Sequence, residues 1–301
     1  MKSSLSSFLS AVQRGAGAAR VAAVAATAIA CAAAPLAADV VELCTSEDNA
    51  LVETRDGSLS LALSEFVFAG RVGNHGGNAK LRRGLLRFDI EGSVPRGSTI
   101  ECVELHLFCA MTNSGEHVVS LHRAEASWGE AESFAQGGAG APATPGDATW
   151  LHRFWPEERW LSAGGDFAPG ASAACIVAFP GPYTWECGEG LVGDVQSWLD
   201  DPATNHGWVV VGDEPFVQSV KAFASRENVV ERQRPRLVVT YAPPAALRAD
   251  LDGDGVVDGE DLAIVLGGWG SCSEPRCAGD LVMDGVVDAL DVAAVIDGWT
   301  I

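Results

Sequence analysis

Residues 101–109 read ECVELHLFC and alternate between two kinds of side chain. The odd positions form an apolar row from Val103 to Cys109, and the even positions from Cys102 onward are more polar. Successive side chains of a strand point to opposite faces, so this pattern predicts a strand buried on one side. Cys102 and Cys109 then lie on opposite faces and cannot readily bond to each other.

The sequence around this strand, residues 41–242, predicts an all-β domain. Eight further short strands are expected between glycine, proline and asparagine clusters, at residues 59–63, 66–72, 85–90, 118–123, 173–179, 208–211, 220–224 and 237–241. Short strands at such spacing favour a β-sandwich of jelly-roll type. One helix is expected at residues 191–199, where Leu191, Val195 and Trp198 recur at helical spacing.

The first 38 residues predict a secretory signal peptide. A basic, serine-rich start is followed by an alanine and valine run, and small residues then continue to Ala38, where cleavage is expected. The apolar run is shorter than the roughly 20 residues of a membrane helix, so no membrane span is expected. Lipid attachment at Cys31 is an alternative. Both interpretations place the chain outside the cell or on its surface.

The net charge bears on possible binding partners, and the cysteine content bears on disulfide bonds. The net charge of −20 argues against nucleic acid as a partner. Seven of the eight cysteines lie after residue 38, which leaves at least one unpaired within the chain. Secreted cysteines can form stable disulfides, and we expect Cys272 and Cys277 to close the short segment between them.

The C-terminal residues 249–301 contain a repeat with a period of 30, after a proline-containing linker at residues 243–248. Residues 249–262 read ADLDGDGVVDGEDL and residues 279–292 read GDLVMDGVVDALDV. Each segment is followed by a short apolar stretch ending in Gly-Trp, at Trp269 and Trp299. A unit this short cannot bury an apolar face alone, so the two halves should pack together.

The first segment has the spacing of a twelve-residue calcium loop. Positions 1, 3, 5, 9 and 12 are Asp250, Asp252, Asp254, Asp258 and Asp261, and Val256 at position 7 offers its backbone carbonyl. Calcium prefers six to eight oxygen ligands, which this spacing wraps around one point. Gly255 stands at position 6, where the loop turns sharply.

The second segment repeats this pattern with one ligand fewer. The expected ligands are Asp280, Asp284, Val286, Asp288 and Asp291, while position 3 is Val282. Water can fill the missing position, so we predict calcium here as well. Val257 and Val287, both at position 8, are expected to lie side by side in the core between the loops.

In these features residues 249–301 resemble a type I dockerin, the duplicated EF-hand-type calcium module of bacterial secreted enzymes. The resemblance implies a small α-helical domain, bound calcium and a cohesin-like protein partner. Its helices are expected to end early, at Gly267 and before Gly298. A calcium-stapled tail without a cohesin partner is therefore the alternative.

Residues 41–242 resemble the DNRLRE domain, a bacterial secreted β-sandwich grouped with carbohydrate-binding modules. The similarity rests on GLLRFDI (84–90), GSTIECVELHL (97–107), LHRAEASWGE (121–130), DVQSWLDDPATNHGW (194–208), FASRE (223–227) and RPRLVVTY (234–241). It implies a jelly-roll fold and, as in some relatives, the binding of polysaccharides that include alginate.

Tryptophans in the irregular segments are candidates for contacts with sugar. Sugar rings stack on exposed flat aromatics, which makes Trp155, Trp160 and Trp185 a candidate binding platform. Trp150 lies in the same region but fits the pattern of the DNRLRE family. The alternative is that all these rings close the ends of the sandwich.

Two carboxylates raise the question of catalysis. Asp89 and Glu227 could be the acid and base of a glycoside hydrolase or a polysaccharide lyase. Each has an arginine within two residues, Arg87 and Arg226, which favours structural charge pairing. We therefore expect a secreted, non-catalytic protein that binds polysaccharide and calcium. The alternatives are an enzyme of these classes and a structural or adhesive surface protein.

Overall fold

The computed structural model describes residues 38–73, 80–244, 248–272 and 277–300. The predicted signal peptide, except Ala38, lies outside the described residues, as do Cys31 and residues 245–247 of the predicted linker. We call residues 38–244 the β-domain and residues 248–300 the C-terminal repeat.

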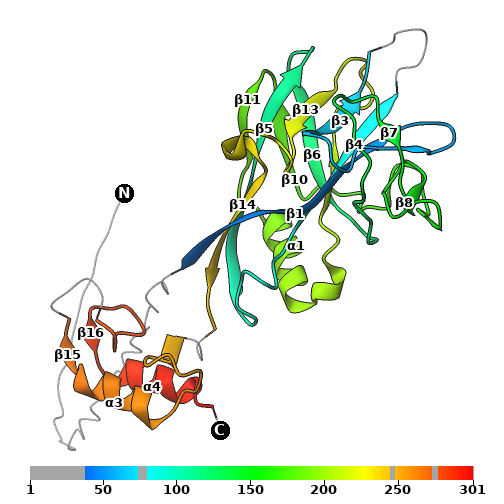
Figure 1. The fold of residues 1–301 in the computed structure, drawn as a ribbon. Coiled ribbons are helices and arrows are strands. Elements are labelled where there is room, and N and C mark those ends of the chain that lie inside the picture. The colour runs from blue at the N-terminus through cyan, green and yellow to red at the C-terminus, as the bar shows by residue number, and fades with distance from the viewer. Residues whose placement is uncertain (1–37, 74–79, 245–247, 273–276, 301) are drawn as a thin grey trace, which may run out of the picture. The chain divides into compact units, whose positions relative to one another are not determined.

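The β-domain is built from antiparallel strands, as the sequence predicts (Figure 1). Its strands are β1 (Asp39–Val52), β2 (Leu59–Ser60), β3 (Phe66–Arg71), β4 (Leu81–Phe88), β5 (Thr99–Thr112), β6 (His117–Arg123), β7 (Ala141–Pro142), β8 (His152–Phe154), β9 (Glu158–Arg159), β10 (Ala173–Val177), β11 (Gly181–Trp185), β12 (Trp208–Val211), β13 (Lys221–Ala224) and β14 (Arg236–Ala242). Its helical segments are α1 (Glu189–Asp200), η1 (Pro202–Thr204) and η2 (Glu231–Gln233).

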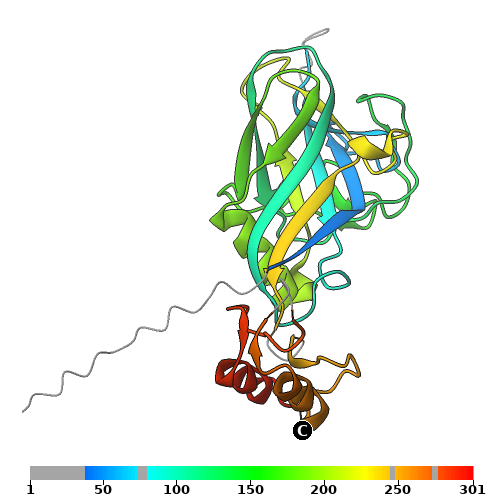
Figure 2. The ribbon, with the colours of Figure 1, turned by 90° about the vertical axis from the view of Figure 1, so that its left-hand side faces the viewer.

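Within the described residues, ten strands form one sheet that closes on itself. The strand order is β1-β14-β5-β13-β3-β4-β12-β6-β10, with β11 added to β5. Strand β1 closes it, because its first half pairs with β14 and its second half with β4. The register shifts between Thr45 and Glu47, where β1 changes partner. Figure 2 shows β14 running between β1 and β5.

Strand β5 confirms the alternation from which its prediction came. Val103, Leu105 and Cys109 are buried, whereas the intervening Cys102 and His106 are only half-buried. The buried side chains of β5 belong to a core that also contains side chains of other strands of this sheet and of α1. Cys102 pairs with Cys187 across a Cα–Cα distance of 5.4 Å, and Cys109 stays free on the other face.

Helix α1 packs against β5 at one end of this core. Its buried apolar residues include Leu191, Val195 and Trp198, as the helical spacing predicts. The Trp198 ring meets Trp208 edge to face with centroids 4.6 Å apart. Asp194, on the same helix face, accepts a hydrogen bond from the Trp208 indole at 2.8 Å. The helix thus contributes its apolar face to the same core as β5.

The structure corrects the predicted strands in several places. The strand expected at residues 59–63 is reduced to the two residues of β2, and β11 was not predicted. Strand β1 was also missed, although it is one of the longest strands. Asp48 and Asn49 of β1 are polar but fully buried. The second half of β1 therefore does not show the alternation of buried apolar and exposed polar residues from which a strand is predicted.

A buried lysine fixes the junction of β5 and β13. Lys221 is fully buried, and its ammonium donates to Thr112 Oγ1 (3.0 Å), the Gly115 carbonyl (2.6 Å) and the Ala178 carbonyl (3.3 Å). Burial lowers the pKa of Lys221. The cation therefore satisfies acceptors from separate segments of the chain.

We expect Lys221→Met to destabilise the β-domain by about 3–5 kcal/mol, because the acceptors around the ammonium lose their donor. Urea unfolding followed by tryptophan fluorescence measures this change. Lys80→Met, at a partly exposed lysine, should cost less than about 0.5 kcal/mol. Equal effects of the two substitutions would show that the buried ammonium contributes little.

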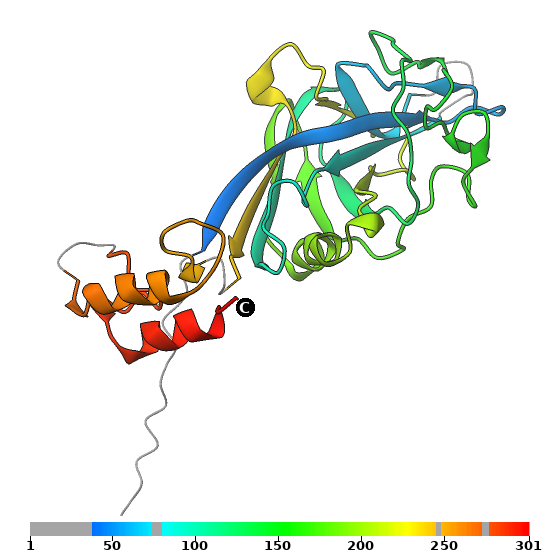
Figure 3. The same ribbon diagram turned by 60° about the horizontal axis from the view of Figure 1, so that its bottom comes forward.

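The C-terminal repeat contains α3 (Gly259–Gly267), β15 (Gly270–Ser271), β16 (Val286–Val287) and α4 (Ala289–Asp297). The two helices pack against each other (Figure 3). Val257, Val265, Val287 and Val295 are buried in one small core between the halves. Among the described residues, no helix is long and apolar enough to cross a membrane.

Candidate functional site

The first aspartate loop, residues 250–261, is shaped by hydrogen bonds from its own backbone. Asp250 accepts the N–H groups of Gly253 at 2.9 Å and Gly255 at 3.0 Å. Asp252 and Asp254 each accept the N–H two residues further along, at 3.1 and 2.8 Å. Gly255 has φ +88°, which glycine adopts without strain, so the chain can reverse at position 6.

Three aspartates of this loop converge. Asp250, Asp252 and Asp254 each place a carboxylate oxygen within 4.8 Å of the other two. Two oxygens that bind one calcium ion, each at about 2.4 Å, are at most about 4.8 Å apart. The three side chains are half-buried or exposed, so an ion can reach them. They can therefore hold a hard divalent cation.

The aspartates at positions 9 and 12 have structural partners and lie outside this group. Asp258 caps α3 and accepts the N–H of Glu260 at 2.8 Å. Asp261 is fully buried and accepts the N–H groups of Leu251 (2.6 Å) and Asp258 (2.9 Å). These backbone donors, Asp258 first, lower the pKa of Asp261. Asp261 therefore fastens both ends of the loop to the start of α3.

The second loop repeats the turn with fewer carboxylates. Asp280 accepts the N–H groups of Asp284 and Gly285, at 3.1 and 3.0 Å. Val282 supplies no oxygen from its side chain at position 3. Met283 has φ +56°, where the first loop has Gly253 with φ +77°. A side chain is strained in this region, so the second loop forms at a higher conformational cost.

The remaining predicted ligands occupy equivalent places in the two loops. Asp288 caps α4, and Asp291 is buried against the backbone of its loop, as Asp258 and Asp261 are in the first loop. Val256 and Val286 follow the turn glycines and are partly exposed at 41% and 37%.

The two halves of the repeat exchange backbone contacts. Val257 donates its N–H to Thr300 Oγ1 at 2.7 Å, and its carbonyl accepts the N–H of Thr300 at 3.0 Å. Val287 pairs with Gly270 in the short ladder of β15 and β16. Thr300 and Gly270 each follow the Gly-Trp of their own half. Val257 and Val287 share one core as predicted, but each backbone pairs with the end of the other half.

The predicted pairing of Cys272 with Cys277 is present, with a Cα–Cα distance of 5.8 Å. Asp280 lies beside this pair. Bonded cysteines offer no thiolate, so sulfur does not compete with oxygen as a metal ligand here.

Gly255 and Gly259 provide a matched test of the loop geometry. A Cβ at either position would meet no atom within 4 Å, but only Gly255 has a positive φ. Gly255→Ala should therefore destabilise the repeat by about 1–2 kcal/mol through backbone strain alone. Gly259→Ala, at the start of α3, should stabilise it by about 0.5 kcal/mol. Thermal unfolding of both variants at fixed calcium checks the opposite signs.

The proposed aromatic platform is corrected at two of its three residues. Trp160 and Trp185 are buried, at 6% and 0% exposure. Their indole N–H groups donate to the carbonyls of Thr149 (2.9 Å) and Val119 (3.0 Å). These rings fill the core and cannot stack on a sugar. Trp155 is half-buried and meets the His152 ring edge to face at 4.7 Å.

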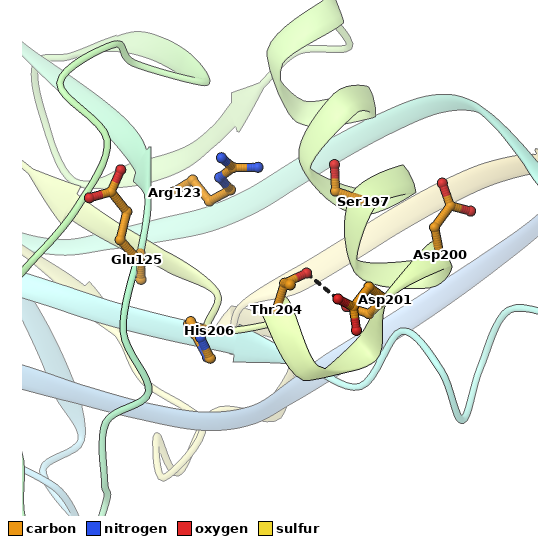
Figure 4. A pocket seen from close by; sticks show the side chains of 8 residues that line it. Arg123, Glu125, Ser197, Asp200, Asp201, Thr204 and His206 are labelled. Carbon is orange, nitrogen blue, oxygen red and sulfur yellow. Dashed lines mark hydrogen bonds between the residues drawn. The ribbon is translucent and has the colours of Figure 1, made fainter.

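The sequence did not single out a pocket of about 500 Å³ between α1 and the end of β6. Figure 4 shows Glu125 and Arg123 on one side of it and Asp200 on the other. The lining residues are Arg123, Ala124, Glu125, Ser197, Asp200, Asp201, Thr204 and His206. Burial lowers the pKa of His206. The pocket offers charged donors and acceptors at close range, a combination that suits a polyhydroxylated ligand.

The expected pairing of Arg87, Asp89, Arg226 and Glu227 is only partly present. Arg226 pairs with Glu227 at 2.8 Å, whereas Arg87 pairs with Glu47. Asp89 is exposed and accepts the N–H of Gly92 at 3.0 Å. Sequence proximity to an arginine thus predicts the partner of Glu227 and fails for Asp89.

Compared with known proteins, the chain matches no family model and no curated protein.

Proposed function

We propose that this chain is a secreted, non-catalytic binding protein whose C-terminal repeat folds around calcium and docks on a protein partner. The convergence of Asp250, Asp252 and Asp254 within 4.8 Å carries this proposal. A bound cation offsets the repulsion between these carboxylates, and folding of the repeat is then linked to calcium.

Exposed apolar side chains support the docking role of the repeat. Leu266 and Trp269 are 53% and 56% exposed, and their equivalents Ile296 and Trp299 are 57% and 41% exposed. Aromatic anchors of this kind are common at the centres of protein interfaces. The repeat thus presents the same apolar pair twice, which fits a dockerin-like module that binds a cohesin-like partner.

For the β-domain we propose polysaccharide binding at the pocket between α1 and β6. Arg123 and His206 can donate to hydroxyl or carboxylate groups, and Asp200 can accept from hydroxyls. The resemblance to the DNRLRE domain and its jelly-roll type supports this assignment. One wall of the pocket belongs to α1 and the segment after it, and the other to the end of β6 and the residues after it.

A polysaccharide binding screen with the full secreted chain tests the β-domain proposal. We expect retention on an acidic or neutral polysaccharide without release of shorter products. Arg123→Ala should weaken retention at least about 10-fold, since charge-assisted hydrogen bonds contribute about 1.5–3 kcal/mol. Arg96→Ala is the matched control, because Arg96 is exposed and its one ion pair among the described residues is with Glu91. Product release would show an enzyme, and failure to bind any polysaccharide would favour a structural or adhesive protein.

Docking is tested with a panel of immobilised cohesin domains. We expect calcium-dependent capture of the full chain, reduced at least about 10-fold when Trp269 and Trp299 are both replaced by alanine. Phe179→Ala, at an exposed aromatic of the β-domain, is the control. Capture that is unaffected by the tryptophan substitutions, or no capture at all, would remove the docking role.

A further inference from the structure

A second group of carboxylates meets inside the β-domain. Asp48 lies on β1, Glu130 follows β6, and Glu227 follows β13. Each places a carboxylate oxygen within 4.8 Å of the other two. The closed sheet brings these three distant positions together. We call this group the buried carboxylate trio.

The trio contains acceptors that the described residues leave without a hydrogen bond. Asp48 is 1% exposed, and its Oδ2 accepts the N–H of Arg226 at 2.7 Å. Its Oδ1 has no hydrogen-bond partner among the described residues, and neither does Glu227 Oε2. A buried acceptor without a partner is costly, and most such atoms in proteins are bonded to a protein group, water or an ion.

The charges of the trio are only partly compensated. Arg226 contacts both glutamates, at 3.0 Å to Glu130 and 2.8 Å to Glu227. Arg234 adds a more distant positive charge that acts on Glu227. Burial raises the pKa of Asp48 and of Glu227, and raises the pKa of Glu130 to about 7. With all three carboxylates ionised, the trio and the contacting guanidinium would carry two negative charges in a site where the Glu130 side chain is 4% exposed. One divalent cation would balance them.

We propose that the trio binds one calcium ion inside the β-domain. All three donors are carboxylates, which suit hard cations and not the nitrogen and sulfur preferences of zinc. The mutual spacing fits oxygens around one calcium ion, as in the first aspartate loop. Asp48 Oδ1 gains a partner, and β1 becomes cross-linked to the segments that follow β6 and β13. This site lies outside the C-terminal repeat and does not depend on the function proposed for it.

The test uses the full secreted chain with both aspartate loops silenced by Asp252→Asn, Asp254→Asn, Asp280→Asn and Asp284→Asn. Calcium is titrated by calorimetry after treatment with a chelator, and unfolding of the β-domain is followed by near-ultraviolet circular dichroism. We expect one calcium ion per chain. The β-domain midpoint should rise by about 5–10 °C when free calcium is about 100 times Kd.

Two further variants of this silenced chain identify the ligands. Glu130→Gln should abolish both the heat of binding and the shift in midpoint. In chelator, Glu130→Gln keeps an amide oxygen as acceptor for Arg226 Nε and removes one of three like charges, while it loses the charged contact to Arg226 Nη2. The near-ultraviolet spectrum in chelator should therefore stay native, and loss of this spectrum would identify misfolding. Asp89→Asn removes an exposed carboxylate just after β4 and should leave both signals unchanged.

Absence of heat and of a midpoint shift in the silenced chain with calcium, magnesium or manganese would overturn the proposal. The trio would then be a self-contained network around Arg226. A calcium response that survives both Glu130→Gln and Glu227→Gln would also overturn it. Failure of the aspartate loops to bind calcium would appear separately, as equal stoichiometry in the unmodified and silenced chains.

Discussion

Removing calcium from the full chain is expected to unfold the C-terminal repeat while the β-domain remains folded. Among the described residues, the repeat has a small core of six buried residues, so we expect its stability to depend on the proposed calcium ions. Calcium at about 100 times Kd should stabilise it by about 2.7 kcal/mol. Calorimetric scans should show a transition that moves with calcium and disappears in chelator.

Replacing Asp252 and Asp254 by asparagine removes two carboxylate charges and keeps the backbone turn. Each side chain uses only Oδ1 to accept a backbone N–H, so asparagine keeps both turns. Asp250 uses both oxygens and would lose one bond. The double variant should weaken calcium binding at the first loop about 100-fold, because affinity follows the number of charged ligands.

Glu260→Gln is the matched control for this pair. Glu260 lies in the first turn of α3, outside the converging oxygens of Asp250, Asp252 and Asp254. Its substitution should leave the calcium affinity within about 2-fold. An unchanged affinity in the Asp252→Asn, Asp254→Asn variant would contradict ligation at positions 3 and 5.

Local sequence patterns predicted the strands and helices in which buried residues recur at a regular spacing. The alternation at residues 101–109 gave the buried face of β5, and helical spacing gave the buried face of α1. In the C-terminal repeat, the early ends of both helices followed from Gly267 and Gly298. Each of these signals lies within one segment.

Strand β1 shows why other elements were missed. Its buried Asn49 donates to the carbonyls of Gly129 and Ala148, and its Oδ1 accepts the N–H of Leu61. A polar residue inside a strand breaks the alternation that sequence analysis uses. The compensating hydrogen bonds come from loops far away in the sequence, so no local window contains them.

The same difference between local and long-range contacts separates the candidate sites that were predicted from those that were missed. The aspartates of the first loop were predicted because the turn brings together residues two positions apart. Asp48, Glu130 and Glu227 were not recognised as a group, since only the closed sheet unites them. The tryptophan platform was wrong for Trp160 and Trp185, because the sequence does not show whether a ring in an irregular segment is exposed. The alternative, in which the rings fill the ends of the sandwich, agrees with their burial. Trp160 and Trp185 lie in the core, where their N–H groups find carbonyl partners.

Removing the disulfide between Cys102 and Cys187 is expected to destabilise the β-domain by about 4–5 kcal/mol. The two residues are 85 positions apart, so the bond closes a long loop in the unfolded chain. The entropy that such a loop removes from the unfolded state grows with its length. Cys272 and Cys277 are five positions apart, and their bond should contribute only about 2 kcal/mol to the C-terminal repeat.

Denaturant unfolding of the Cys102→Ser, Cys187→Ser variant measures the larger effect, with the Cys272→Ser, Cys277→Ser variant beside it. Cys44→Ser is the control, because Cys44 is free and exposed and should cost less than about 0.5 kcal/mol. Strand β11 pairs with β5 from Gly181 to Trp185, next to the bond, so the folded register is already set without it. The destabilisation should therefore come from the unfolded chain and appear as a lower midpoint with native near-ultraviolet spectra. Similar losses for the long and short loops would refute this entropic origin.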